Sequence, residues 1–213
     1  MVRARRFRRI AAALVIVLAL TAARPSLAKD READFRKLKD WAYLALGAAS
    51  GFVAHELSHV VADAIFGKSI SFVGVKLGPF PFFAIQPCCN LTPKEEYVIA
   101  SAGFDMQNIN SELILWLAPH LRARRQAFLK GVLLLDVALD LGYGITALAN
   151  VGPPQSDVMT MARGLGIPTW PIGLMLIVPA AMDVLRYFQP DNRWAPFASL
   201  QAKSMTLGLS FTF

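Results

Sequence analysis

Four long apolar stretches limit the environment in which this sequence can fold. The chain is 55% hydrophobic and only 17% charged, which is too apolar for an ordinary soluble domain. Each stretch approaches or exceeds the roughly 20 apolar residues that an α-helix needs to cross a bilayer. They cover approximately residues 41–66, 97–118, 127–149 and 168–188. The sequence therefore predicts an all-α polytopic membrane protein with about four transmembrane helices, in one membrane-embedded core of residues 29–188.

The N-terminal segment has a different pattern from the rest of the chain. Five arginines precede an apolar run from Ile10 to Leu20, and Ser26-Leu27-Ala28 follows. This layout is typical of a secretory signal peptide over residues 1–28 with cleavage after Ala28, and an uncleaved signal anchor is the alternative. We therefore expect an integral membrane protein of the bacterial cell envelope, in the inner rather than the outer membrane.

The net charge of +7 does not indicate a nucleic-acid partner, because five of the positive charges precede the apolar run of the N-terminal segment. Another cluster, LRARRQ at 121–126, lies between two apolar stretches. A basic loop in that position is normally a topology signal or a contact with lipid headgroups. Four alternating spans from an exported N-terminus would put this loop outside, against the positive-inside rule, so the sequence leaves the orientation open.

Two segments alternate with the period of a β-strand. SISFVGVKLGPFPFF begins at Ser69 and has a turn signal at Gly78-Pro79, which predicts a short β-hairpin or re-entrant segment after the first span. Such a backbone is tolerated at membrane depth only where protein or a water-filled cavity satisfies its polar groups. The C-terminal region 189–213 ends in SMTLGLSFTF, a β-like tail whose strand could pair with residues 69–77.

Two of the apolar stretches carry an unusual number of polar side chains. A helix should begin at Thr92, with Pro93 at its first position. The third stretch places Asp136 and Asp140 one helical turn apart. Polar side chains inside a membrane normally face the protein interior and are candidates for function. Those of the second stretch are Asp105, Gln107, Asn108, Asn110 and Glu112.

The first apolar stretch contains AHELSHV at residues 54–60, an H-E-x-x-H pattern. On a helix, His55 and His59 project to one side and can bind one Zn²⁺, while Glu56 can accept a proton from a metal-bound water. A catalytic zinc normally has three protein ligands, so a third must come from elsewhere. Asp157 lies in a turn-rich segment from which a side chain can be directed into a cavity. The residues alone leave the third ligand open among Asp157, Asp105, Asp136, Asp140 and His120.

Over roughly residues 45–165 the sequence resembles the site-2 protease family of intramembrane zinc metalloproteases. Four blocks occur in the family's order, namely HELSHVVADAIFG, SFVGVKLGPF, TPKEEYVIASAG and NVGPPQSD. The resemblance implies that Asp157 is the third zinc ligand beside His55 and His59, with Glu56 as general base. An asparagine of the family falls on Gln107 or Asn108, either of which would bind the substrate or the developing oxyanion.

The expected function is therefore that of a zinc-dependent intramembrane endopeptidase, acting on membrane-embedded or membrane-proximal polypeptides in the lipid bilayer. The substrate would be presented as an extended strand beside residues 69–77. Two alternatives remain at this stage. One is a protease relic that binds metal without cleaving, since Val158 follows Asp157 where the family usually has glycine. The other is a transporter with a polar relay of Asp105, Glu112, Asp136 and Asp140.

Overall fold

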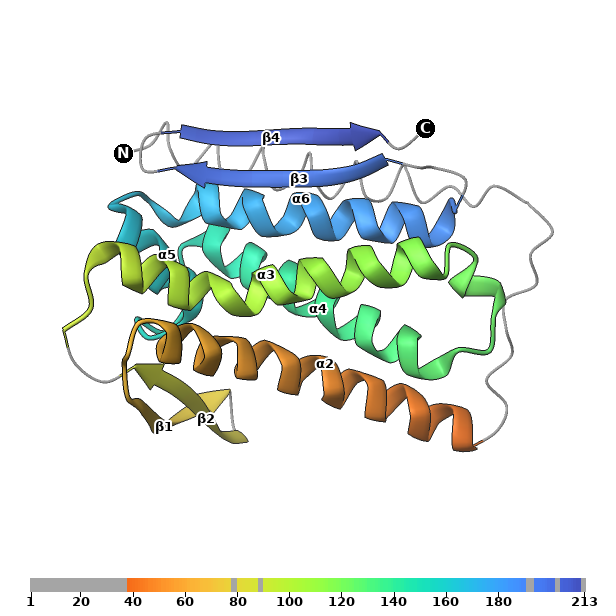
Figure 1. The fold of residues 1–213 in the computed structure, drawn as a ribbon, viewed down its shortest axis with the longest axis horizontal. Coiled ribbons are helices and arrows are strands. Elements are labelled where there is room, and N and C mark those ends of the chain that lie inside the picture. Colours follow the sequence, from red (N-terminus) through yellow and green to blue (C-terminus); the bar gives the residue numbers. More distant parts are fainter. Residues whose placement is uncertain (1–37, 78–79, 88–89, 191–193, 202–203, 212–213) are drawn as a thin grey trace.

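A computed structural model describes residues 38–77, 80–87, 90–190, 194–201 and 204–211 (Figure 1). The predicted signal segment 1–28 lies outside the described residues. The α-helices are α2 (Leu38–Ile65), α3 (Pro93–Leu117), α4 (Ala127–Ala149), α5 (Asp157–Leu165) and α6 (Thr169–Phe188), with a 3-10 turn η1 (Leu121–Ala123) between α3 and α4.

Three helices, α2, α4 and α6, are long and apolar enough to cross a membrane, which indicates a membrane protein. The predicted span at 97–118 does form a helix, α3, but it is not among these three. Its polar residues lower its hydropathy, although it is 25 residues long. Of the four transmembrane helices expected from the sequence, three are therefore long and apolar enough to cross a membrane.

The backbones of α2 and α4 touch along their first halves, because both helices have glycine at the crossing. A Cβ atom at Gly131 would lie 2.9 Å from the backbone nitrogen of Ala48, and a Cβ at Gly47 would overlap the carbonyl group of Phe128. The pairing of Gly47 with Phe128, and of Gly51 with Asp136 further along, shows that α2 and α4 run in the same direction. Figure 1 shows α3 and α6 running the opposite way beside them.

Two pairs of strands accompany the helices. β1 (Ile70–Leu77) pairs antiparallel with β2 (Phe80–Pro87), close to the end of α2 (Figure 1). β3 (Trp194–Gln201) pairs antiparallel with β4 (Ser204–Phe211), and β3 contacts α6. The suggested pairing of the tail with residues 69–77 is therefore wrong. Strands that are neighbours in the sequence close the shorter loop, at a smaller cost in chain entropy.

The segments around α3 and α5 fix the position of the candidate site. The helix start predicted at Thr92 is confirmed: the Thr92 hydroxyl accepts from the Glu95 backbone N–H, and the Thr92 backbone N–H donates to the Glu95 carboxylate at 2.7 Å. The segment after Asn150, interpreted from the sequence as turn-rich, instead contains α5. That helix buries Val158, Met161 and Ala162, whose three-to-four-residue spacing gives even a short helix an apolar face.

Candidate metal centre

The two histidines of the H-E-x-x-H pattern lie one turn apart on the inner face of α2. His55 is 2% exposed and His59 is 5% exposed, and both lie in a helix of largely apolar residues. Their rings meet edge to face, and the two Nε2 atoms lie 3.2 Å apart. The helix thus directs two imidazole nitrogens to one point in the interior.

Asp157 completes this group from a distant part of the sequence. It is the first residue of α5, directly after the N-cap Ser156. Its Oδ2 atom lies 3.7 Å from Nε2 of His55 and 3.7 Å from Nε2 of His59. A carboxylate at a helix N-terminus is favoured by the helix dipole, so α5 both aims and stabilises this side chain.

Arg163 links α5 to α3 and to the preceding loop through hydrogen bonds. Its Nε donates to the Glu96 carboxylate on α3 at 3.2 Å, and one of its terminal nitrogens donates to the Pro154 carbonyl at 3.4 Å. The loop that precedes Asp157 is therefore tied to the helix that follows it and to α3. This arrangement restricts the position of Asp157 relative to the two histidines.

The orientation of His59 is set by a backbone group of α3. The Nδ1 atom of His59 lies 2.7 Å from the carbonyl oxygen of Ile99. A carbonyl oxygen can only accept, so Nδ1 carries the hydrogen and donates it. The Nε2 atom then has its lone pair free on the side of His55 and Asp157, as metal-binding histidines usually do.

His55 is held by close packing against α3. The Phe104 ring meets it edge to face, with the ring centroids 5.4 Å apart. A Cβ atom at Gly103 would lie within 2.6 Å of both ring nitrogens of His55. The imidazole therefore occupies the space that any other residue at position 103 would fill, which explains the glycine.

The three donor atoms have a spacing that suits a small metal ion. One ligand atom from each of His55, His59 and Asp157 lies within 4.8 Å of the others. Tetrahedral ligands at about 2.1 Å from zinc lie roughly 3.4 Å from one another. The distances of 3.2, 3.7 and 3.7 Å are close to that value. Two imidazoles and one carboxylate, with a fourth position left for water, are also a typical catalytic zinc donor set.

Two further side chains approach the group. Glu56, on α2 between the histidines, is half-buried and close enough to His55, His59 and Asp157 to interact with their charges. Tyr143 on α4 is close enough to Asp157 and Glu56 to interact with their charges, and its ring packs against Phe104. Tyr143 is not among the residues predicted from the sequence, since the candidates on the third apolar stretch are its carboxylates, Asp136 and Asp140.

The two amides considered as substrate or oxyanion donors differ in position. Gln107 is fully buried, and its carboxamide lies beside His55. Asn108 instead donates to the carbonyl of Phe104 in its own helix at 3.0 Å. Gln107 is therefore the one of the two that can reach a substrate bound at this centre.

The other residues considered as third ligand lie outside the group. Asp136 is fully buried and near His55, and Asp140 is buried one turn further along α4. Asp105 accepts a hydrogen bond from Ser101 on α3. His120 lies beside η1, where α3 ends. Within the described part of the chain, His55, His59 and Asp157 are the residues whose donor atoms converge.

Comparison with known proteins does not assign this chain to a family. No family model matches it, and neither a curated protein nor a solved structure matches it.

Proposed function

We propose that the protein is a zinc-dependent intramembrane endopeptidase and a divergent member of the site-2 protease family. The observation that carries the proposal is the convergence of His55, His59 and Asp157 around one point, with Glu56 beside them. The apolar helices α2 and α4 that contribute to this region support a membrane location. The N-terminal sequence pattern supports the cell envelope, in the inner rather than the outer membrane.

The proposed reaction is hydrolysis of a peptide bond. His55, His59 and Asp157 would hold zinc, which supplies a Lewis acid that lowers the pKa of a bound water towards about 7 and polarises the scissile carbonyl. Glu56 takes a proton from the attacking water and delivers it to the nitrogen of the leaving amine as the C–N bond breaks. The hydroxyl oxygen remains on the carbonyl carbon as the new carboxylate.

Buried polar groups around the centre have separate roles in this proposal. The Gln107 carboxamide donates to the oxygen on which negative charge develops, where a hydrogen bond is worth more than in water. The Tyr143 hydroxyl, near both Glu56 and Asp157, is a second donor to the substrate. The Ile99 carbonyl holds the His59 ring in the orientation that the ion requires.

The substrate is a membrane-embedded or membrane-proximal polypeptide in an extended conformation. In the described part of the chain, β1 and β2 form a sheet of two strands, so each strand has an edge without a strand partner. Such an edge can add a third strand through main-chain hydrogen bonds. This supports presentation of the substrate beside β1, which follows the metal-binding helix directly.

The test separates metal binding from chemistry. The purified protein and the Glu56→Gln variant are compared for zinc content and for cleavage of a pool of single-span model peptides in the same vesicles, with products identified by mass spectrometry. Glu56→Gln should keep its zinc and lose cleavage. A zinc chelator should abolish cleavage by the unaltered protein, and added zinc should restore it.

The same experiment has an outcome that contradicts the proposal. If the unaltered protein holds zinc but cleaves none of the peptides, it is a metal-binding relic of a protease. If Glu56→Gln cleaves as fast as the unaltered protein, the proton transfer assigned to Glu56 is wrong.

A further inference from the structure

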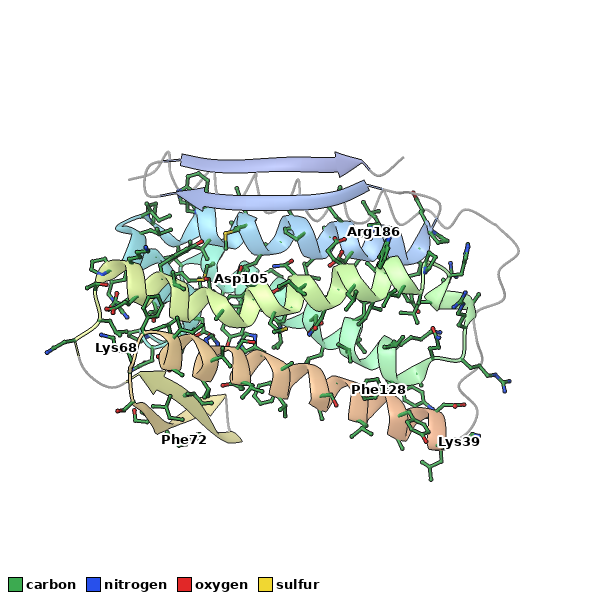
Figure 2. The ribbon with its side chains drawn as sticks, viewed as in Figure 1. Lys39, Lys68, Phe72, Asp105, Phe128 and Arg186 are labelled. Carbon is green, nitrogen blue, oxygen red and sulfur yellow. The ribbon has the colours of Figure 1, made fainter. Side chains whose placement is uncertain are left out.

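Four helix ends meet at the end of the bundle that lies away from the metal centre. The first half of α2 packs on the start of α4 through Gly47 and Gly131, and Arg122 lies over the ring of Phe188 at the end of α6, 5.1 Å from its centroid. η1 joins the end of α3 to the start of α4. In Figure 2, Lys39, Phe128 and Arg186 lie towards this end, while Lys68 lies at the opposite one. We refer to the surface formed by residues 38–43, 116–130 and 186–188 as the basic end.

The loop of the basic end has a fixed conformation. Leu121 is fully buried, and the ammonium group of Lys130 donates to the carbonyl of Arg122 at 2.9 Å. Arg122 itself packs on Phe188. The next two basic residues, Arg124 and Arg125, are exposed directly after this anchored turn. Lys39, at the start of α2, is exposed as well.

Two basic residues at the opposite end of the bundle form ion pairs with carboxylates. At the opposite end, Lys68 lies 3.2 Å from the Glu95 carboxylate, and Arg163 lies 3.2 Å from that of Glu96. Among the residues that the structure describes, Arg124 and Arg125 have no such carboxylate partner. The basic end therefore carries two adjacent arginines whose charge no carboxylate of the described residues compensates by an ion pair.

Large aromatic side chains are exposed on the same end. Trp41 on α2 is 56% exposed and Trp116 on α3 is 71% exposed, and Tyr43, Phe128 and Phe188 are also exposed. Tryptophan and tyrosine at helix ends are typical of the interface between hydrocarbon and headgroups. The exposed tryptophans lie near the ends of α2 and α3, and the exposed arginines lie in the connection between η1 and α4. Their coincidence at one end of the bundle is therefore a property of the fold.

We propose that the basic end is a binding surface for anionic phospholipid headgroups, in which Arg124 and Arg125 contact the phosphate groups and Trp41 and Trp116 lie beside the glycerol region. Arginine is suited to this role because its planar guanidinium can donate two hydrogen bonds to one phosphate. The surface does not depend on the proposed peptidase activity. It depends only on the positions of charge and aromatic rings.

This surface also fixes the depth of the metal centre. At 1.5 Å per residue, α2 rises about 21 Å from Trp41 to His55 and about 27 Å to His59. The hydrocarbon core is about 30 Å thick. With Trp41 at one interface, the metal centre lies near the other, and water reaches it from the side opposite the basic end.

The test measures lipid selectivity of the full-length protein. Tryptophan fluorescence is followed while brominated phosphatidylglycerol, or brominated phosphatidylcholine as the neutral reference, replaces unlabelled phosphatidylcholine around the protein. The quantity compared is the ratio of the two binding constants. The unaltered protein should prefer phosphatidylglycerol, and Arg124→Gln with Arg125→Gln should reduce that ratio roughly tenfold or more.

Two control variants make the result specific to the basic end. Lys68→Gln with Lys94→Gln removes the same charge from the opposite end and should leave the ratio unchanged. Arg124→Lys with Arg125→Lys keeps the charge and should retain most of the preference. Equal binding of the two lipids by the unaltered protein, or an equal loss of preference in both glutamine variants, would overturn the proposal.

Discussion

The Nδ1 atom of His59 on α2 donates a hydrogen bond of 2.7 Å to the carbonyl oxygen of Ile99 on α3. This contact joins residues 40 positions apart and leaves Nε2 of His59 facing His55 and Asp157. The histidine is therefore oriented by a backbone group that a side-chain substitution at Ile99 cannot remove. The polar helix α3 therefore helps to position α2, the helix that carries the two histidines.

The packing of α3 under His55 gives the first prediction. Gly103→Ala would place a methyl group in the space of the His55 ring, so the imidazole must move from its place beside His59. We expect a loss of about 1–3 kcal/mol in the free energy of unfolding, as for other overpacked sites, together with weaker zinc binding. Thermal unfolding and zinc competition with a chromogenic chelator measure the two effects.

Gly142→Ala is the matched control for that substitution. A Cβ atom at Gly142 in α4 has no neighbour within 4 Å. Alanine is the better helix former by up to about 1 kcal/mol, so this variant should be as stable as the unaltered protein or slightly more stable. Equal zinc affinity in the Gly103→Ala and Gly142→Ala variants would show that Gly103 does not hold the His55 ring in place.

The buried amide of α3 gives the second prediction. Gln107→Leu removes a carboxamide near His55 and replaces it with an apolar side chain of similar size. Because the amide is assigned to the developing oxyanion and not to the ion, kcat should fall on the order of 100-fold with zinc content unchanged. Asn108→Leu, which alters a side chain bonded to its own helix, should change kcat little. The assignment fails if the two variants lose the same activity.

The start of α3 gives a prediction about pH. The backbone N–H of Thr92 donates to Glu95, and the Thr92 side chain and Lys68 add to this, so the pKa of Glu95 lies below its usual range. A carboxylate with a lowered folded-state pKa stabilises the fold above its unfolded pKa, and this contribution is lost as the pH falls through the folded value. The first turn of α3 should therefore loosen in acid.

Amide hydrogen exchange in the first turn of α3 tests this effect. Glu95→Gln should exchange faster than the unaltered protein at neutral pH, and the difference should shrink as the pH falls below the usual range of a glutamate. A difference that stays constant over that range would mean that the charge of Glu95 does not stabilise the helix start.

Local sequence patterns were enough to predict the helices and part of the candidate site. The spacing of His55 and His59 identifies one face of a helix, and the Thr92–Glu95 pattern marks the start of another, because both depend on residues within one turn. The apolar composition of α2, α4 and α6 likewise identifies helices that can cross a membrane. These features need no knowledge of the tertiary fold.

Contacts between distant segments could not be predicted from the sequence. Nothing local to Asp157 shows that α5 brings it to the histidines, and its role was chosen by resemblance from among five candidates. The approach of Tyr143 to Asp157 and the contact of Gly103 with His55 also depend on how the helices pack. In each case, residues far apart in the chain meet only after packing is complete.

We propose that one zinc ion is held by His55, His59 and Asp157. The most direct test of this proposal is the metal content of the purified protein beside the His55→Ala and Asp157→Ala variants, measured by mass spectrometry, with His120→Ala as the control histidine away from the site. We expect about one zinc per chain in the unaltered protein and in His120→Ala, and far less in the other two variants. Full zinc content in Asp157→Ala, with loss in Asp136→Ala, would contradict it.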